Sequence, residues 1–158
     1  MKKTIVFLLI SFGYLFVTYS QTNHCVIRIT FPTTGSTVPY LGSTINFNIC
    51  QRLQANQLPV VFIQDPRGEW WPYISSINTP DPLRWQLDEV QYGIPSNIGR
   101  TFIIRVVLID RRLNSNGFTF NGHTYFVQGN TSISPQLFAE ILRMYPNDYS
   151  SPIDVIRK

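Results

Sequence analysis

Residues 101–109 read TFIIRVVLI, a run that is apolar at every position except Thr101 and Arg105. β-Branched and aromatic side chains dominate it, as they do in strands. We therefore expect this run to form the central strand of a sheet. Residues 59–64 (PVVFIQ) are apolar at every position except Gln64, which is typical of a strand covered on both faces.

Two earlier segments alternate between apolar and polar residues, which indicates half-buried strands. They are residues 26–31 (VIRITF) and residues 43–50 (STINFNIC). The side chains predicted to point inward are Ile27, Ile29, Phe31, Ile45, Phe47 and Ile49.

Two further strands are expected on either side of the loop that contains Pro80 and Pro82. Residues 65–68 (DPRG) predict a tight turn, with Pro suited to its second position and Gly to its last. The chain then returns as residues 69–74 (EWWPYI), and residues 83–92 (LRWQLDEVQY) bring Trp85 to the core. Six strand candidates with no helix between them favour a β-sandwich.

The C-terminal third has a different pattern. Residues 110–133 are polar and rich in Gly and Asn, which predicts a long loop with one short strand at residues 124–127. Ser134-Pro135 is typical of a helix start, and apolar residues at helical spacing predict a helix over about residues 135–145 that covers the sandwich. Residues 153–157 predict the last strand.

The order of several short motifs resembles that of secreted immunoglobulin-like or fibronectin-III-like modules of bacterial extracellular proteins. The matching positions are Pro32, Gly35, Val38, Gly68, Trp70, Trp71, Pro72, Trp85, Gly93, Gly99, Phe102, Ile104, Val155 and Arg157. Asn97 departs from the pattern, which often has Asp there, and the cysteine pair is not part of it. The resemblance implies an all-β, immunoglobulin-like sandwich of about seven strands, with one short C-terminal helix before the last strand. It also implies an extracellular setting, but no activity.

The N-terminus has the features of a secretory signal peptide. Lys2 and Lys3 precede an uncharged, largely apolar run over residues 4–19, so we expect residues 1–20 to be removed before Gln21. One domain over residues 21–158 would then be secreted. The alternative is an uncleaved membrane anchor. Loss of both lysines lowers the net charge from +4 to +2, and the remaining arginines are scattered, which argues against nucleic acid as a partner.

The two cysteines, Cys25 and Cys50, are expected to form one structural disulfide in an oxidising compartment. Placing residues 26–31 antiparallel to residues 43–50 brings both cysteines to the same end of the strand pair. They are one residue out of register there, so a local irregularity is needed.

The sequence offers no convincing catalytic set, and we predict neither an enzyme nor a cofactor. Asp65 with Glu69, and Asp88 with Glu89, could bring carboxylates together, but turn and strand-surface carboxylates more often serve solubility. His123 and the serines lack the context of an activated nucleophile, and no set of ligands for a metal is apparent. Asn130 begins an N-glycosylation motif, which matters only in a eukaryote.

The aromatic residues are the better candidates for binding. Trp70, Trp71 and Tyr73 lie on one predicted strand, so one tryptophan should be buried and the other exposed. An exposed ring near Tyr73 or Tyr40 could stack on a sugar or anchor a protein. The alternative is that both tryptophans are buried by a loop or by the C-terminal helix. We expect a non-catalytic interaction or adhesion module that binds an extracellular protein, with a carbohydrate-binding module as the alternative.

Overall fold

A computed structural model of the chain describes residues 26–74, 81–110, 117–120, 123–126 and 131–158. The strands are β1 (Arg28–Phe31), β2 (Ser36–Val38), β3 (Ser43–Asn48), β4 (Gln57–Gln64), β5 (Trp70–Ile74), β6 (Arg84–Val90), β7 (Thr101–Asp110), β8 (Gly117–Phe120), β9 (His123–Phe126) and β10 (Ile153–Arg157). A 3-10 turn, η1 (Pro95–Asn97), precedes β7, and the helix α1 (Pro135–Met144) precedes β10.

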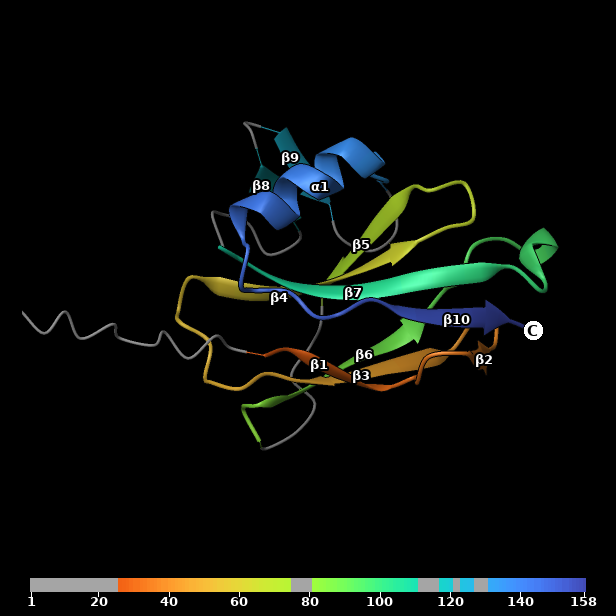
Figure 1. Cartoon of the computed structure of the whole chain (residues 1–158), viewed down its shortest axis with the longest axis horizontal. Helices are drawn as coiled ribbons and strands as arrows, with labels where there is room; N and C mark the ends of the chain where they lie inside the picture. Colours follow the sequence, from red (N-terminus) through yellow and green to blue (C-terminus); the bar gives the residue numbers. More distant parts are fainter. Residues whose placement is uncertain (1–25, 75–80, 111–116, 121–122, 127–130) are drawn as a thin grey trace, which may run out of the picture.

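Two sheets face each other and form a sandwich (Figure 1). One sheet has the order β1-β3-β6, and the other has the order β2-β10-β7-β4-β5. β7 is the middle strand of the larger sheet, as its apolar sequence predicts. β8 and β9 form a separate antiparallel hairpin. The predicted two-sheet, mostly β architecture with one helix before the last strand is therefore confirmed for the described part of the chain.

The two sheets share one hydrophobic core. The smaller sheet contributes Ile45, Phe47, Trp85 and Leu87, and the larger one contributes Val61, Ile63, Phe102, Ile104, Val106, Leu108 and Val155. The rings of Phe47 and Trp85 are stacked, with centroids 6.4 Å apart. Trp85 is therefore a core residue, as its pattern predicts.

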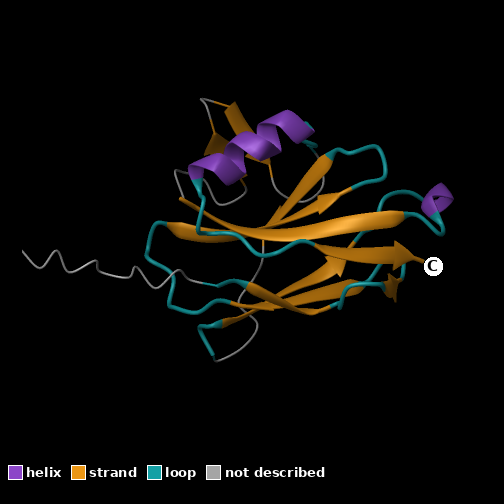
Figure 2. Cartoon of the chain, in the orientation of Figure 1, coloured by secondary structure: helices purple, strands orange, loops and turns teal. Residues whose placement is uncertain are grey.

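A second core lies on the outer face of the larger sheet, beneath α1 (Figure 2). Phe138 and Ile141 of the helix pack with Val60, Phe62, Val107 and Ile109. The Ser134 hydroxyl accepts a hydrogen bond from the Leu137 N–H at 3.2 Å, and Pro135 occupies the first turn, so the helix begins where the sequence predicts. Because both cores use β4 and β7, these strands are buried on both faces.

The register between β1 and β3 agrees with the prediction at one end only. Arg28 pairs with Asn48 and Ile29 with Phe47, but Phe31 pairs with Asn46 instead of Ile45. The shift arises from an irregularity between Ile29 and Phe31. One extra residue reverses the alternation of side chains. The prediction that Phe31 points inward is therefore wrong, and its side chain is 48% exposed.

Two of the described strands, β2 and β8, have no counterpart among the predicted strand segments, because they lie where loops were expected. β2 is three residues long and pairs in parallel with β10, more than a hundred residues away in the chain. β8 lies in the polar segment where only one short strand was expected. Cys25, Asn130 and residues 1–20 lie outside the described residues, so the disulfide, the glycosylation site and the signal peptide stay predictions. Among the described residues, no helix is both long and apolar enough to span a membrane.

Candidate functional site

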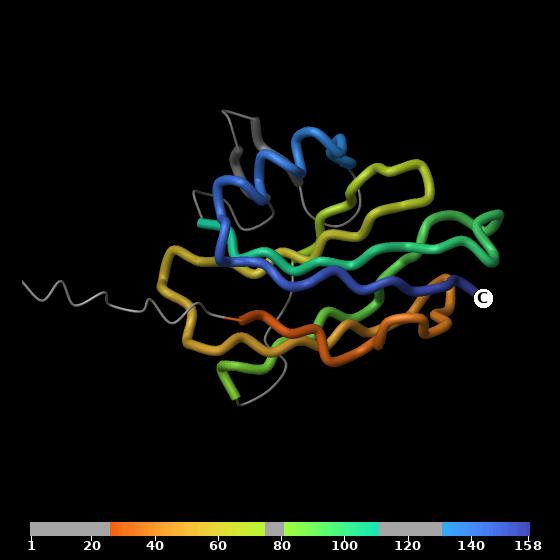
Figure 3. The backbone as a smooth tube through the Cα atoms, viewed as in Figure 1, coloured from red at the N-terminus to blue at the C-terminus, as the bar shows by residue number. Residues whose placement is uncertain are grey.

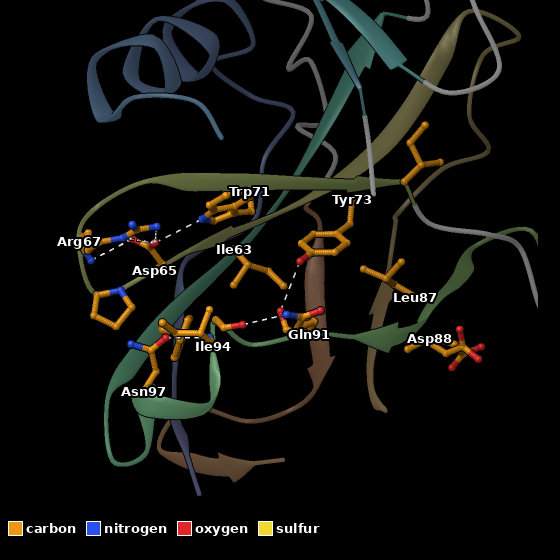
Figure 4. Close-up of a pocket in the computed structure, with 15 residues that line it drawn as sticks. Ile63, Asp65, Arg67, Trp71, Tyr73, Leu87, Asp88, Gln91, Ile94 and Asn97 are labelled. Atoms are coloured by element: carbon orange, nitrogen blue, oxygen red, sulfur yellow. Dashed lines mark hydrogen bonds and ion pairs between the residues drawn. The ribbon is translucent and has the colours of Figure 1, made fainter. Parts of the chain in front are cut away.

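A groove of about 810 Å³ lies between the two sheets, where each sheet ends in an edge strand (Figure 4). β5 is the edge of the larger sheet and β6 is the edge of the smaller one. One wall is formed by β5 and the turn before it. The other is formed by the end of β6 and the segment that leads through η1 to β7. The lining is mixed, with apolar side chains from Ile63, Leu87 and Phe102 and polar ones from Asp88, Glu89, Gln91 and Asn97.

β5 sends its two tryptophans to opposite faces of the sheet. Trp70 is only 6% exposed, and its ring stacks on Phe138 of α1 with centroids 3.8 Å apart. Trp71 and Tyr73 are partly exposed on the other face and line the groove. The helix thus buries one tryptophan, and the groove receives the other.

The turn before β5 fixes the position of Trp71. The Asp65 carboxylate is buried and accepts hydrogen bonds from the N–H groups of Arg67 and Glu69 at 2.9 and 3.1 Å. The Arg67 guanidinium pairs with the same carboxylate at 2.8 Å. The Trp71 Nε1–H donates to Asp65 Oδ2 at 3.4 Å. Asp65 is therefore occupied in organising the turn and the indole, and the expected Asp-Pro-Arg-Gly turn is present, closed by the Gly68 N–H to the Asp65 carbonyl.

Tyr73 crosses from one wall of the groove to the other (Figure 4). Its hydroxyl donates to the Gln91 carbonyl oxygen at 3.3 Å, and burial raises the pKa of the Tyr73 phenol above its ordinary value. The Gln91 side-chain amide in turn donates to the Tyr40 hydroxyl at 3.1 Å and to the Gly93 carbonyl at 2.9 Å. Gln91 therefore joins the two predicted tyrosines, although Tyr40 does not itself line the groove.

The second wall is a compact turn over Ile94–Gly99. The Asn97 side chain accepts a hydrogen bond from the Ile94 N–H at 2.8 Å, which closes the turn. Gly93 has a φ of +69°, and a Cβ there would lie 2.3 Å from the Asn97 side-chain oxygen. Only glycine fits this position. Asn97 is thus the residue that holds the turn.

Two neighbouring carboxylates lie at the other end of the groove from Asp65 and Arg67. Asp88 and Glu89 together face one residue of β3, because the register shifts between Ser43 and Ile45. Glu89 has a φ of +56°, which is unfavourable for a residue with a side chain. Such a bulge redirects side chains at a sheet edge. The charges of Asp65 and Arg67 offset each other, so this end of the groove is the more acidic.

The structure brings together two of the four aromatic residues predicted for binding, Trp71 and Tyr73. Tyr40 is connected to them through Gln91. Trp70 does not reach the groove, because it is buried beneath the helix on the other face of the sheet. The roles of Gln91 and Asn97 were not predicted. Each acts through a backbone carbonyl or amide brought close by the fold, and no sequence spacing signals such a contact.

No protein-family model matches this chain, and no curated protein matches it in a sequence comparison. Among the described residues, no three His, Cys, Asp or Glu side chains form a group that could hold a metal ion.

Proposed function

We propose that this chain is an exported, immunoglobulin-like binding module whose groove between β5 and β6 takes a carbohydrate. The strand order supports the fold type. In the variable-type immunoglobulin arrangement, a strand C′ extends the G-F-C sheet, and the order β10-β7-β4-β5 corresponds to G-F-C-C′. The order β1-β3-β6 corresponds to A-B-E in the opposite sheet.

The observation that carries the ligand class is the pairing of Trp71 and Tyr73 on one face of β5, inside a concave site. Aromatic rings offer a sugar an apolar face. Around them, Arg67, Gln91 and Asn97 supply amide and guanidinium groups that can hydrogen-bond to hydroxyls. A concave, partly apolar site with a few placed polar groups is typical of small-ligand recognition.

The charges of the groove suggest which sugars fit. Arg67 is already paired with Asp65, whereas Asp88 and Glu89 add two negative charges at the other end. Like charges brought together lower affinity. Neutral sugars or amino sugars should therefore bind better than uronic or sialic acids.

A protein partner is the second candidate, supported by a different observation. Ile94 and Ile98 flank the second wall with exposed side chains, and Ile98 is 68% exposed. Ile156, also exposed, lies close by, because Arg157 hydrogen-bonds to Gly99 and Arg100. Exposed apolar side chains grouped at one end of a domain are typical of protein contacts.

A glycan array probed with the secreted chain tests the proposal, followed by calorimetry with the oligosaccharides it selects. Neutral or amino oligosaccharides should bind, and Trp71→Ala should weaken them at least tenfold. The matched control, Ile98→Asp, should leave sugar binding unchanged but abolish capture of a protein partner. Sugar binding that Trp71→Ala does not affect, or no binding to any glycan, would contradict the carbohydrate assignment.

A further inference from the structure

Arg157 is a buried cation near the C-terminal end of β10. Only 4% of it is exposed, and no carboxylate in the described part of the chain forms an ion pair with it. Its Nε–H has no hydrogen-bond partner among these residues. A buried charge without a counter-charge is unfavourable for folding, so Arg157 stands out among the core residues.

The side-chain contacts of Arg157 involve the second wall of the groove and the tyrosine behind it. Its Nη1 donates to the Ile94 carbonyl oxygen, and its guanidinium lies 4.7 Å from the centre of the Tyr40 ring. Its backbone N–H donates to Arg100 at 3.1 Å, and its carbonyl accepts from Gly99 at 2.7 Å. One residue therefore holds both the beginning and the end of the turn over Ile94–Gly99.

Tyr40 extends this connection to the first wall. Its hydroxyl accepts from Gln91, whose carbonyl in turn accepts from Tyr73 on β5. A continuous series of contacts thus runs from Arg157 through Tyr40 and Gln91 to Tyr73. The geometry points to Arg157 as a positioning residue that sets the separation of the two walls without touching the ligand.

Any effect of Arg157 on ligand affinity rests on the proposed function. Its effect on the stability of the second wall does not, so the two effects can be tested separately. Arg157→Met keeps an unbranched, apolar side chain of similar volume but removes the charge and the donors. Replacing a buried charge by an apolar residue of similar volume is often neutral or stabilising. We therefore expect an unchanged or higher melting temperature, together with hydrogen exchange at least tenfold faster at the amides of Ile94, Asn97, Gly99 and Arg100.

Arg105→Met is the matched control. Arg105 lies over the Tyr149 ring at 5.5 Å, so the same type of contact is removed away from the groove, and exchange over Ile94–Gly99 should not change. Arg157→Lys keeps the charge near Tyr40 and should restore part of the protection. Should Arg157→Met fail to fold, Tyr40→Leu removes the ring contact alone and should speed up exchange at the same amides. Unchanged exchange in the folded variant would overturn the inference.

The binding arm uses the oligosaccharide selected on the array. Arg157→Met should weaken it about tenfold, while Arg105→Met should bind like the original chain. Equal binding by both variants would overturn the positioning role. If the original chain binds no glycan through Trp71, the proposed function fails, and the exchange result alone then decides the role of Arg157.

Discussion

The indole N–H of Trp71 lies 3.4 Å from the Asp65 carboxylate, so the turn that reverses the chain also orients the ring that lines the groove. We expect Asp65→Ala to lower the free energy of unfolding by about 2–3 kcal/mol, because two backbone N–H groups and the Trp71 indole lose the buried, charged acceptor that they share. Urea denaturation measures this loss. Arg67→Ala is the control: the Arg67 side chain is 74% exposed and should cost under about 1 kcal/mol. Equal losses for both variants would contradict the organising role of Asp65.

The two adjacent tryptophans should respond differently to truncation. Trp70→Ala removes a ring stacked on Phe138 in the second core, which should cost about 3–5 kcal/mol. Trp71→Ala removes a partly exposed ring and should cost much less. Unfolding curves of the two variants measure the difference. A larger loss for Trp71→Ala would show that the helix does not depend on Trp70.

Glu89 should be a site where a smaller residue stabilises the fold. Its φ of +56° costs a residue with a Cβ about 1–2 kcal/mol, and glycine avoids this cost. After allowing for the extra freedom of glycine in the unfolded chain, Glu89→Gly should raise the free energy of unfolding by about 0.5–1 kcal/mol. Asp88→Gly, at a position without positive φ, should lower it. Thermal unfolding of both variants provides the comparison, and a decrease for Glu89→Gly would be contrary to expectation.

Two tyrosines, the buried Tyr92 and the partly buried Tyr73, make the stability sensitive to high pH. Burial raises the pKa of Tyr92 far above its ordinary value of 10.0, against a smaller opposing effect of the Ser43 hydroxyl, and it also raises that of Tyr73. The folded state favours the neutral phenols. Their contribution to the free energy of unfolding is therefore complete below the pKa of a tyrosine in the unfolded chain, and it is lost as the pH rises beyond about 10. Unfolding measured across this range should show a decline that is smaller in Tyr92→Phe. An identical decline in that variant would exclude Tyr92 as its source.

The predicted Cys25–Cys50 disulfide should tie the first strand to its neighbour. Closing a loop of this length stabilises by roughly 3 kcal/mol in the chain-entropy description, so Cys50→Ser should lower the free energy of unfolding by about that amount. Peptide mass spectrometry without reduction tests the bond directly. Two free thiols in secreted protein would refute it.

Local patterns were sufficient for most of the fold. The apolar run of β4 predicted a strand buried on both faces, and that of β7 predicted the central strand of a sheet. Ser134-Pro135 predicted the start of α1. The register of β1 was missed at Phe31, because alternation alone does not reveal an extra residue. β2 was missed because its three residues gain their structure only from pairing with β10.

The groove was less predictable than the fold. Alternation along β5 correctly separated Trp70 from Trp71, but it could not show which of them the helix would bury. Gln91 has no sequence signal, and the motif match at Arg157 indicates no role, because both roles depend on where the backbone of Ile94–Gly99 comes to lie. A charged residue in a terminal strand is usually exposed to solvent. Arg157 is instead buried.

The parallel pairing of β2 with β10 also determines how the domain would respond to mechanical force. The first described residues and the C-terminus lie towards opposite ends of the sandwich (Figure 3). Tension between them would pull β2 and β10 in opposite directions along their length. The hydrogen bonds of this pairing, in which Val155 lies opposite Ser36, Ile156 opposite Thr37 and Arg157 opposite Val38, would then be loaded together in shear instead of being opened one after another. A module anchored through one end while holding a ligand would therefore resist extension at this short strand pair before its core is strained.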